Sequence, residues 1–154
     1  MRLDHQYQNA YVTRDLDAAL EIFRSRYDFD GFMRIEVSYP LKTPRREGSA
    51  SVKLALGWIG NVQYEIIQPV SGLIDVYQEG LDHDAPMRFH HVCMRVSDWA
   101  EFRARVDEER RPVVMEGGTP GHLLWLYVDA RDTLGHYLEY CWMTPERWTA
   151  MGGR

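Results

Sequence analysis

A weak internal repeat limits the folds open to this chain. QNAYVTRD (8–15) and HVCMRVSD (91–98) share a layout, and the offset of 83 residues that aligns Gln8 with His91 also aligns Asp15 with Asp98. In both copies an alternating apolar run ends at an aspartate, and apolar residues at helical spacing follow. Two copies of one supersecondary unit explain this pattern.

Each copy has the periodicity of a strand, a helix and three strands. The helices are predicted to begin after Asp15 and Asp98, which are good N-cap residues, and Glu101 stands where a capping box needs it. Pro40, Gly48 and other prolines and glycines are expected to end strands. The predicted strands are 7–13, 32–39, 50–59 and 62–68 in the first copy, and 89–96, 111–116, 122–129 and 136–142 in the second, with a turn at 116–121.

The length of 154 residues and the 45% hydrophobic content are enough for one well-buried core. We therefore expect a single domain over 1–154, with module one at about 6–69, module two at about 89–143, and a short terminal helix at about 144–150. The linker, residues 70–88, is long for a compact protein, which suggests a functional crossover. Its apolar residues, expected to act as a tether or lid, are Leu73, Ile74, Val76 and Tyr77.

Composition excludes several classes of protein. The net charge of −5 comes without a basic stripe, so nucleic acid is not an expected partner. The longest apolar run, 123–128, is too short to span a membrane. Two cysteines cannot form a disulfide framework, and the N-terminal residues lack the apolar core of a signal peptide. We expect a cytoplasmic protein whose partner is a small molecule.

Four polar residues occupy matching strand positions. Gln8 and His91 open the first strand of each module, and Glu65 and Glu139 lie midway along the last. Both glutamates have apolar neighbours, and a buried carboxylate is almost never left unpaired. A salt bridge to Arg95 or Arg34 would satisfy them. His91 alone would be an ordinary core histidine, and Gln8 could simply hydrogen-bond.

The chain resembles the vicinal oxygen chelate superfamily, which includes glyoxalase I and methylmalonyl-CoA epimerase. The stretches that carry the resemblance are QNAYVTRDLDAAL, YEIIQP, FHHVCMRVSD and DTLGHYLEYCW, and the likeness covers nearly the whole chain. The resemblance implies an α+β fold in which two tandem βαβββ modules form a half-open mixed β-barrel with the helices outside. It also implies a homodimer, with each barrel formed within one chain or between two.

The resemblance further implies one divalent metal ion, Zn, Ni, Co, Mn or Mg, held by one residue from each of four strands. Carried over by position, the metal ligands are Gln8, Glu65, His91 and Glu139. Their order looks like that of glyoxalase I, and three oxygen donors with one imidazole suit such an ion. The set departs from the triad of two histidines and one carboxylate in iron dioxygenases, so oxygen activation is less expected.

Strand alternation predicts what surrounds these ligands. If they face inward, so do Arg95 and Tyr137, which become candidate substrate-binding residues. Arg95 could equally pair with a glutamate. Cys93 and Cys141 also face inward, as small core residues. His90 is expected on the opposite face, in a structural hydrogen bond.

The implied activity is that of a metal-dependent isomerase, epimerase or lyase, similar to glyoxalase. Such an enzyme would move a proton next to a carbonyl of a small oxygenated substrate, with Glu139 as the first candidate base and Glu65 as its partner. Two alternatives remain. One is a metal-free binding protein of the drug-sequestering, bleomycin resistance type. The other is a dimeric scaffold whose strands enclose only packed side chains.

Overall fold

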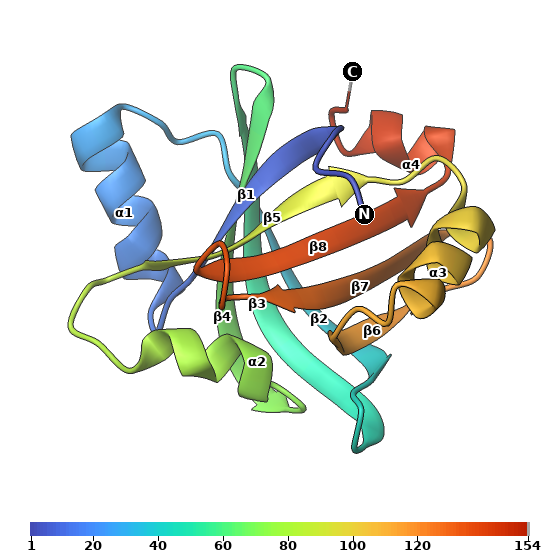
Figure 1. The fold of residues 1–154 in the computed structure, drawn as a ribbon. Helices are drawn as coiled ribbons and strands as arrows, with labels where there is room; N and C mark the ends of the chain where they lie inside the picture. Colours follow the sequence, from blue (N-terminus) through green and yellow to red (C-terminus); the bar gives the residue numbers. More distant parts are fainter. Residues whose placement is uncertain (154) are drawn as a thin grey trace.

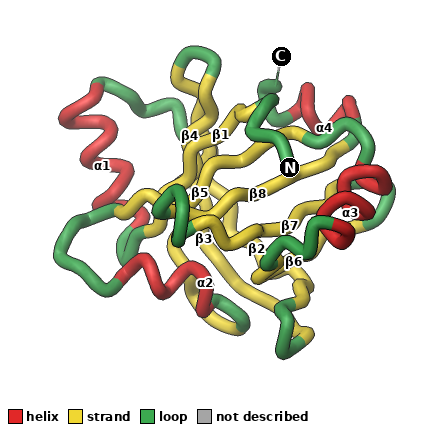
Figure 2. The backbone as a smooth tube through the Cα atoms, viewed as in Figure 1, coloured by secondary structure: helices red, strands yellow, loops and turns green. Residues whose placement is uncertain are grey.

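The computed structural model describes residues 1–153, and these form one closed β-barrel with helices packed outside it (Figures 1 and 2). The strand order around the barrel is β1-β4-β3-β2-β6-β7-β8-β5. The first module consists of β1 (Gln6–Val12), α1 (Leu16–Tyr27), β2 (Met33–Lys42), β3 (Glu47–Ile59) and β4 (Val62–Gly72).

The second module repeats this order after a short helical crossover. The crossover contains α2 (Asp75–Gln78) and the 3-10 helix η1 (Glu79–Leu81). None of the helices in the described part of the chain is both long and apolar enough to cross a membrane. The second module and the terminal helix are β5 (Arg88–Arg95), α3 (Trp99–Glu108), β6 (Val113–Thr119), β7 (Leu123–Ala130), β8 (His136–Met143) and α4 (Pro145–Ala150).

The predicted duplication is confirmed, down to equivalent helix caps. The Asp15 carboxylate accepts a hydrogen bond from the Ala18 N–H at 3.0 Å, and the Asp98 carboxylate accepts one from the Glu101 N–H at 2.9 Å. The Glu101 side chain accepts from Arg105 instead of closing a capping box. The two aspartates at the repeat offset therefore begin α1 and α3 in the same way.

The predicted α+β fold, with two modules in one mixed β-barrel and the helices outside, is confirmed, and the barrel closes within one chain. One seam between the modules is long, because β1 and β5 pair over most of their length. The other seam joins β2 to β6 through two residue pairs, Leu41 with Gly117 and Lys42 with Glu116. Most of β2 therefore has a free edge on this side.

Three predicted strand ends were wrong. The strand predicted at 62–68 continues to Gly72 as β4, and Pro69 inside it pairs with Val52. Pro40 and Gly48 lie inside β2 and β3, where they pair with Ser49 and Leu41 respectively. Pro40 itself has no paired residue on β6, because the pairing of β2 with β6 begins at Leu41, and proline is tolerated at such an edge of a ladder. The turn predicted at 116–121 is also shorter, because β6 continues to Thr119.

Three groups of buried side chains form the core. One fills the barrel interior and includes Ala10, Cys93 and Cys141. The helices α1 and α3 flank the barrel on opposite sides (Figure 1), and each covers one of the other two groups. The alternation predicted for β5 and β8 thus holds for Met94 and Leu138, which face α3.

Candidate metal centre

Four adjacent strands, β4, β1, β5 and β8, position the candidate ligands through their register. Ala10 on β1 pairs with Glu65 on β4 and with His91 on β5. The carboxylate of Glu65 and the imidazole of His91 therefore lie on either side of the Ala10 methyl group. Glu139 on β8 pairs with Cys93, two residues further along β5. Residues two apart on a strand share a face, so all three polar side chains enter the barrel together.

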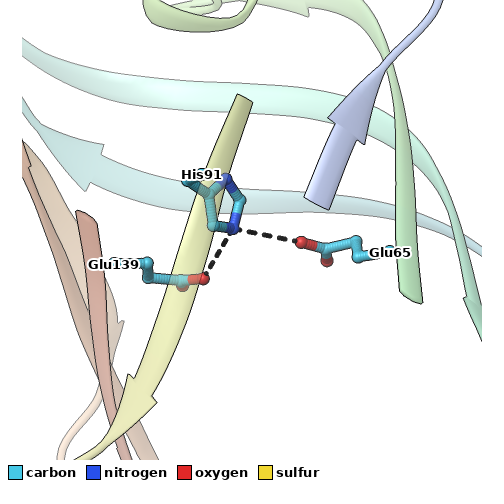
Figure 3. Close-up of side chains that lie close together, drawn as sticks. All are labelled: Glu65, His91 and Glu139. Carbon is cyan, nitrogen blue, oxygen red and sulfur yellow. Dashed lines mark ion pairs between the residues drawn. The ribbon is translucent and has the colours of Figure 1, made fainter. Parts of the chain in front are cut away.

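The three side chains meet at one point (Figure 3). His91 Nε2 lies 3.0 Å from Glu139 Oε2 and 3.5 Å from Glu65 Oε2. One ligand atom from each residue lies within 4.8 Å of the other two. The His91 side chain is fully buried, and those of Glu65 and Glu139 are only 13% and 12% exposed.

The electrostatics of the cluster are unfavourable without a cation. Burial, and then the like charge of Glu139, raise the pKa of Glu65 well above its ordinary value. The arginines considered as salt-bridge partners lie elsewhere, since Arg34 pairs with Asp17 and Arg95 stacks on Trp148. The two glutamates have no arginine or lysine partner among residues 1–153.

Gln8 is buried beside this cluster and leaves an acceptor atom free. Its Nε2 donates a hydrogen bond to Gln63 Oε1 at 2.8 Å, across the paired strands β1 and β4. Gln8 Oε1 has no hydrogen-bond partner in the described part of the chain, and neither does His91 Nε2. Buried polar atoms seldom remain unsatisfied. Two free lone-pair donors beside two carboxylates form a donor set that suits a divalent cation.

His90 lies on the same side of the strand as His91, so the prediction that it faces the opposite side was wrong. A bulge is the cause, because Ala10 pairs with His91 while the next residue, Tyr11, pairs with Phe89. His90 is the extra residue, and the alternation breaks there. The expected structural hydrogen bonds are present: His90 Nδ1 lies 2.9 Å from His91 Nδ1, and His90 Nε2 lies 2.9 Å from the Val76 carbonyl oxygen.

The two glutamates and Gln8 line a cavity of about 320 Å³. Its walls are largely aromatic and aliphatic, with Tyr39 and Tyr77 joined by a hydrogen bond of 2.9 Å between their hydroxyls. A pocket with apolar walls and a few convergent polar groups is the usual form of a small-molecule site. The main wall residues are Tyr39, Leu54, Ile67, Tyr77, Trp125 and Tyr127.

Two polar residues at the mouth of the cavity were not predicted from the sequence. Arg147 on α4 and His122 before β7 both line the cavity, and Arg147 Nη1 lies 2.8 Å from His122 Nε2. His122 is exposed to solvent and Arg147 is half-buried, so they mark the mouth of the cavity. No local pattern identifies them, because α4 approaches β7 only in the folded chain. Tyr39 could have been found, since it shares an alternating face with Ile35 and Val37.

The two candidate substrate-binding residues lie away from this cavity. The Arg95 guanidinium lies 4.2 Å above the Trp148 ring, in a separate pocket beneath α4. The Tyr137 hydroxyl donates to Glu79 Oε2 at 2.8 Å, and the Arg131 guanidinium lies 4.7 Å above the Tyr137 ring. Tyr137 thus contacts the crossover, and neither residue is among those that line the cavity.

Comparison with known families decides the relationship. A family model described as the Glyoxalase/Bleomycin resistance protein/Dioxygenase superfamily matches residues 7–127. The chain belongs to this superfamily. Membership in the glyoxalase/bleomycin resistance/dioxygenase superfamily confirms the resemblance drawn from the four stretches of sequence. No curated protein matches the chain.

Solved structures with the superfamily fold cover nearly the whole chain. A methylmalonyl-CoA epimerase from Streptomyces coelicolor, in complex with 2-nitronate-propionyl-CoA, has a TM-score of 0.64 at 17% identity and covers 94% of this chain and 97% of its own. A methylmalonyl-CoA epimerase from Mycobacterium tuberculosis has a TM-score of 0.60 at 14% identity, with 94% and 91% covered. At this identity the likeness shows the fold alone.

Proposed function

We propose that this protein is a metal-dependent isomerase or epimerase that moves a proton next to a carbonyl of a small, oxygenated, anionic substrate. One observation carries the proposal: Glu65, His91 and Glu139 bring ligand atoms within 4.8 Å of one another beside the cavity. Superfamily membership supports it.

The residues that would hold the cation are Glu65, His91 and Glu139, with Gln8 Oε1 as a fourth donor. A bound divalent cation would act as a Lewis acid and make a C–H bond next to a carbonyl more acidic. This chain already supplies a neutral donor and two carboxylates for such an ion. A side chain of the protein must then act as the base that removes the proton from this C–H bond.

The two glutamates are placed to move that proton. They approach the site from opposite sides of His91 (Figure 3). Glu139 is the candidate base, and Glu65 is the carboxylate on the opposite side of the site (Figure 3). A substrate carbon beside them could lose its proton to Glu139, and Glu139 could return that proton to the same carbon or to its neighbour. Returning the proton to the neighbouring carbon shifts it along the substrate, and returning a proton from the side of Glu65 would invert the centre, which requires that Glu65 first takes up a proton from solvent.

The cavity limits the substrate. Its volume of about 320 Å³ corresponds to about ten water molecules, which suits a small acid or the acyl end of a thioester but not a whole coenzyme A. The guanidinium of Arg147 at the mouth favours a carboxylate or phosphate there. The aromatic and aliphatic walls of the cavity suit the apolar part of such a substrate.

Two measurements test this function. Elemental analysis of protein purified without a histidine tag should find about one divalent metal per chain. A screen of dicarbonyls, acyl-CoA thioesters and aromatic acids in D₂O should then find metal-dependent exchange of a C–H proton. Glu139→Gln should reduce that exchange about a hundredfold or more while the fold persists, and Glu36→Gln, on the exposed face of β2, serves as the control. Unchanged exchange in Glu139→Gln removes Glu139 from this role.

The aromatic walls also favour a second function, metal-free binding of an apolar molecule. A binding protein of this kind has no need of two buried carboxylates without a cationic partner, and they raise the free energy of its folded state. Protein that binds aromatic ligands tightly, and contains no metal after growth in metal-supplemented medium, would support the binding function instead. The cavity argues against the scaffold alternative, which requires a filled interior.

A further inference from the structure

The bulge at His90 gives this protein a second buried imidazole next to the candidate ligand. In a regular strand, neighbouring side chains point to opposite faces and cannot bond to each other. Here the extra residue turns the His90 ring to within 5.2 Å of the His91 ring, at an interplanar angle of 81°. Bulges of this kind occur often beside active sites, where they re-aim a side chain.

Both ring nitrogens of His90 are engaged, although the residue is only 4% exposed. Nδ1 lies 2.9 Å from His91 Nδ1, and Nε2 lies 2.9 Å from the Val76 carbonyl oxygen. The rings of Tyr137, Tyr77 and Tyr127 surround His90 at 4.9, 5.3 and 6.1 Å. The ring therefore has one packed orientation.

The donor and the acceptor can be assigned in each of the two hydrogen bonds that link His91 to His90 and His90 to Val76. A carbonyl oxygen only accepts, so His90 Nε2 carries a hydrogen and donates it to Val76. An imidazole nitrogen that ligates a cation does so through its lone pair, so His91 Nδ1 must carry the ring proton when Nε2 is the ligand. His90 Nδ1 is then the acceptor for that proton. This arrangement of protons gives every ring nitrogen of His90 and His91 a partner, with the cation as the partner of His91 Nε2.

We infer that His90 is a positioning residue for the metal centre: it accepts the His91 Nδ1–H and so holds the Nε2 lone pair of His91 toward Glu65 and Glu139. The inference rests on the proposed cation site. Groups that bond to the outer nitrogen of a ligand histidine fix its tautomer and ring orientation. The crossover supplies the last acceptor of these two hydrogen bonds, the Val76 carbonyl oxygen in α2.

The crossover is packed tightly enough to serve as a fixed support. A side-chain carbon added at Gly80 in η1 would lie 2.7 Å from Val12 Cγ2, so only glycine lets this segment approach β1 so closely. Tyr137 also holds the segment, through its hydrogen bond to Glu79. The segment 70–88 thereby orients an imidazole in the barrel through its backbone.

The first experiment needs no substitution. Zinc-loaded protein, labelled with ¹⁵N at histidine, is examined by two-bond ¹H–¹⁵N correlation and by scalar coupling across hydrogen bonds. We expect the proton on His91 Nδ1, a lone pair on His90 Nδ1, and a measurable coupling between these two nitrogens. A proton on His90 Nδ1, or His91 bound through Nδ1, overturns the inference.

The second experiment measures zinc affinity by competition with a chromophoric chelator. His90→Phe keeps a ring but removes both hydrogen bonds, and should weaken zinc binding by about 10–100-fold. His90→Asn keeps an acceptor near the position of Nδ1 and should recover most of that loss. His136→Phe is the matched control, because His136 forms a hydrogen bond with the Tyr137 carbonyl group and none with His90 or His91. It should bind zinc like the wild type.

The outcomes separate the two proposals. Wild-type protein that binds no zinc contradicts the proposed metal centre. Wild-type protein that binds zinc, together with a folded His90→Phe variant of equal affinity, leaves the centre intact and refutes the role of His90. If His90→Phe does not fold, the tautomers of the zinc-loaded wild type still decide the question.

Discussion

Replacing Glu65 by glutamine should stabilise the metal-free protein while it destroys the metal centre. The closest ligand atoms of Glu65 and Glu139 are no more than 4.8 Å apart, so at an effective dielectric constant of about 20 two ionised carboxylates would repel by at least about 3 kcal/mol. Protonation limits this cost, because a proton bound to Glu65 removes one of the two charges, in keeping with the raised pKa of Glu65.

The pH dependence follows from the direction of the pKa shift. The folded protein holds the Glu65 proton more tightly than the unfolded chain does, so stability falls as the pH rises above about 4.5. The fall continues until the pH passes the raised pKa. Glutamine does not titrate. Glu65→Gln should therefore gain about 1–3 kcal/mol over the wild type at pH 7, and nothing at pH 4.

Urea unfolding in the presence of a chelator, at pH 4, 5.5 and 7, measures this difference. Glu36→Gln is the matched control, since the Glu36 side chain is 78% exposed and should change stability little at any pH. Adding zinc at a hundred times its dissociation constant should stabilise the wild type by about 2.7 kcal/mol and the Glu65→Gln variant much less. A variant less stable than the wild type at pH 7, or a difference that does not change with pH, would refute the electrostatic reasoning.

Three further results are expected. Trp148→Ala should lower the free energy of unfolding, measured by urea titration, by about 3–5 kcal/mol. The reason is that Trp148 is only 9% exposed and its ring packs edge-on against Tyr7, with 5.0 Å between ring centroids. A loss below about 1 kcal/mol would contradict this packing role. Arg147→Met should raise KM for an anionic substrate about tenfold or more and leave kcat nearly unchanged. The control Arg45→Met, in the exposed turn before β3, should leave KM unchanged. Equal KM values in both variants would remove Arg147 from the site. Zinc binding should release protons, because the raised pKa makes Glu65 hold its proton more tightly and that proton must leave when the carboxylate becomes a ligand. Calorimetry in buffers of different ionisation enthalpy measures the release, and an equal release from Glu65→Gln would mean that Glu65 is not its source.

The periodicity of the chain was enough to predict most of the fold. The repeat of Asp15 and Asp98 located both helix starts, because an N-cap depends on residues a few positions away. The family resemblance implied that Glu65, His91 and Glu139 converge, and the three side chains do meet inside the barrel. The lengths of β2 and β3 were less predictable, because Pro40 is tolerated only where a neighbouring strand is missing.

Side-chain placement near the ends of the barrel was not predictable in the same way. Arg95 and Tyr137 face inward by alternation, yet α4 and the crossover cover them with Trp148 and Glu79. His122 and Arg147 belong to different elements that meet at the cavity mouth. Whether a residue on an inner face reaches the cavity depends on which distant segment packs against it.

The sequence by itself determined the duplicated βαβββ order and the helix caps, since local backbone geometry converts spacing along the chain into a face of a strand or helix. Only the tertiary structure decided that β5 carries an extra residue opposite Ala10, which turns His90 toward His91. It also decided that the barrel closes and that Arg147 reaches its mouth. A bulge, a seam and a docked helix each depend on a partner strand or surface far away in the chain, and no local pattern encodes that partner.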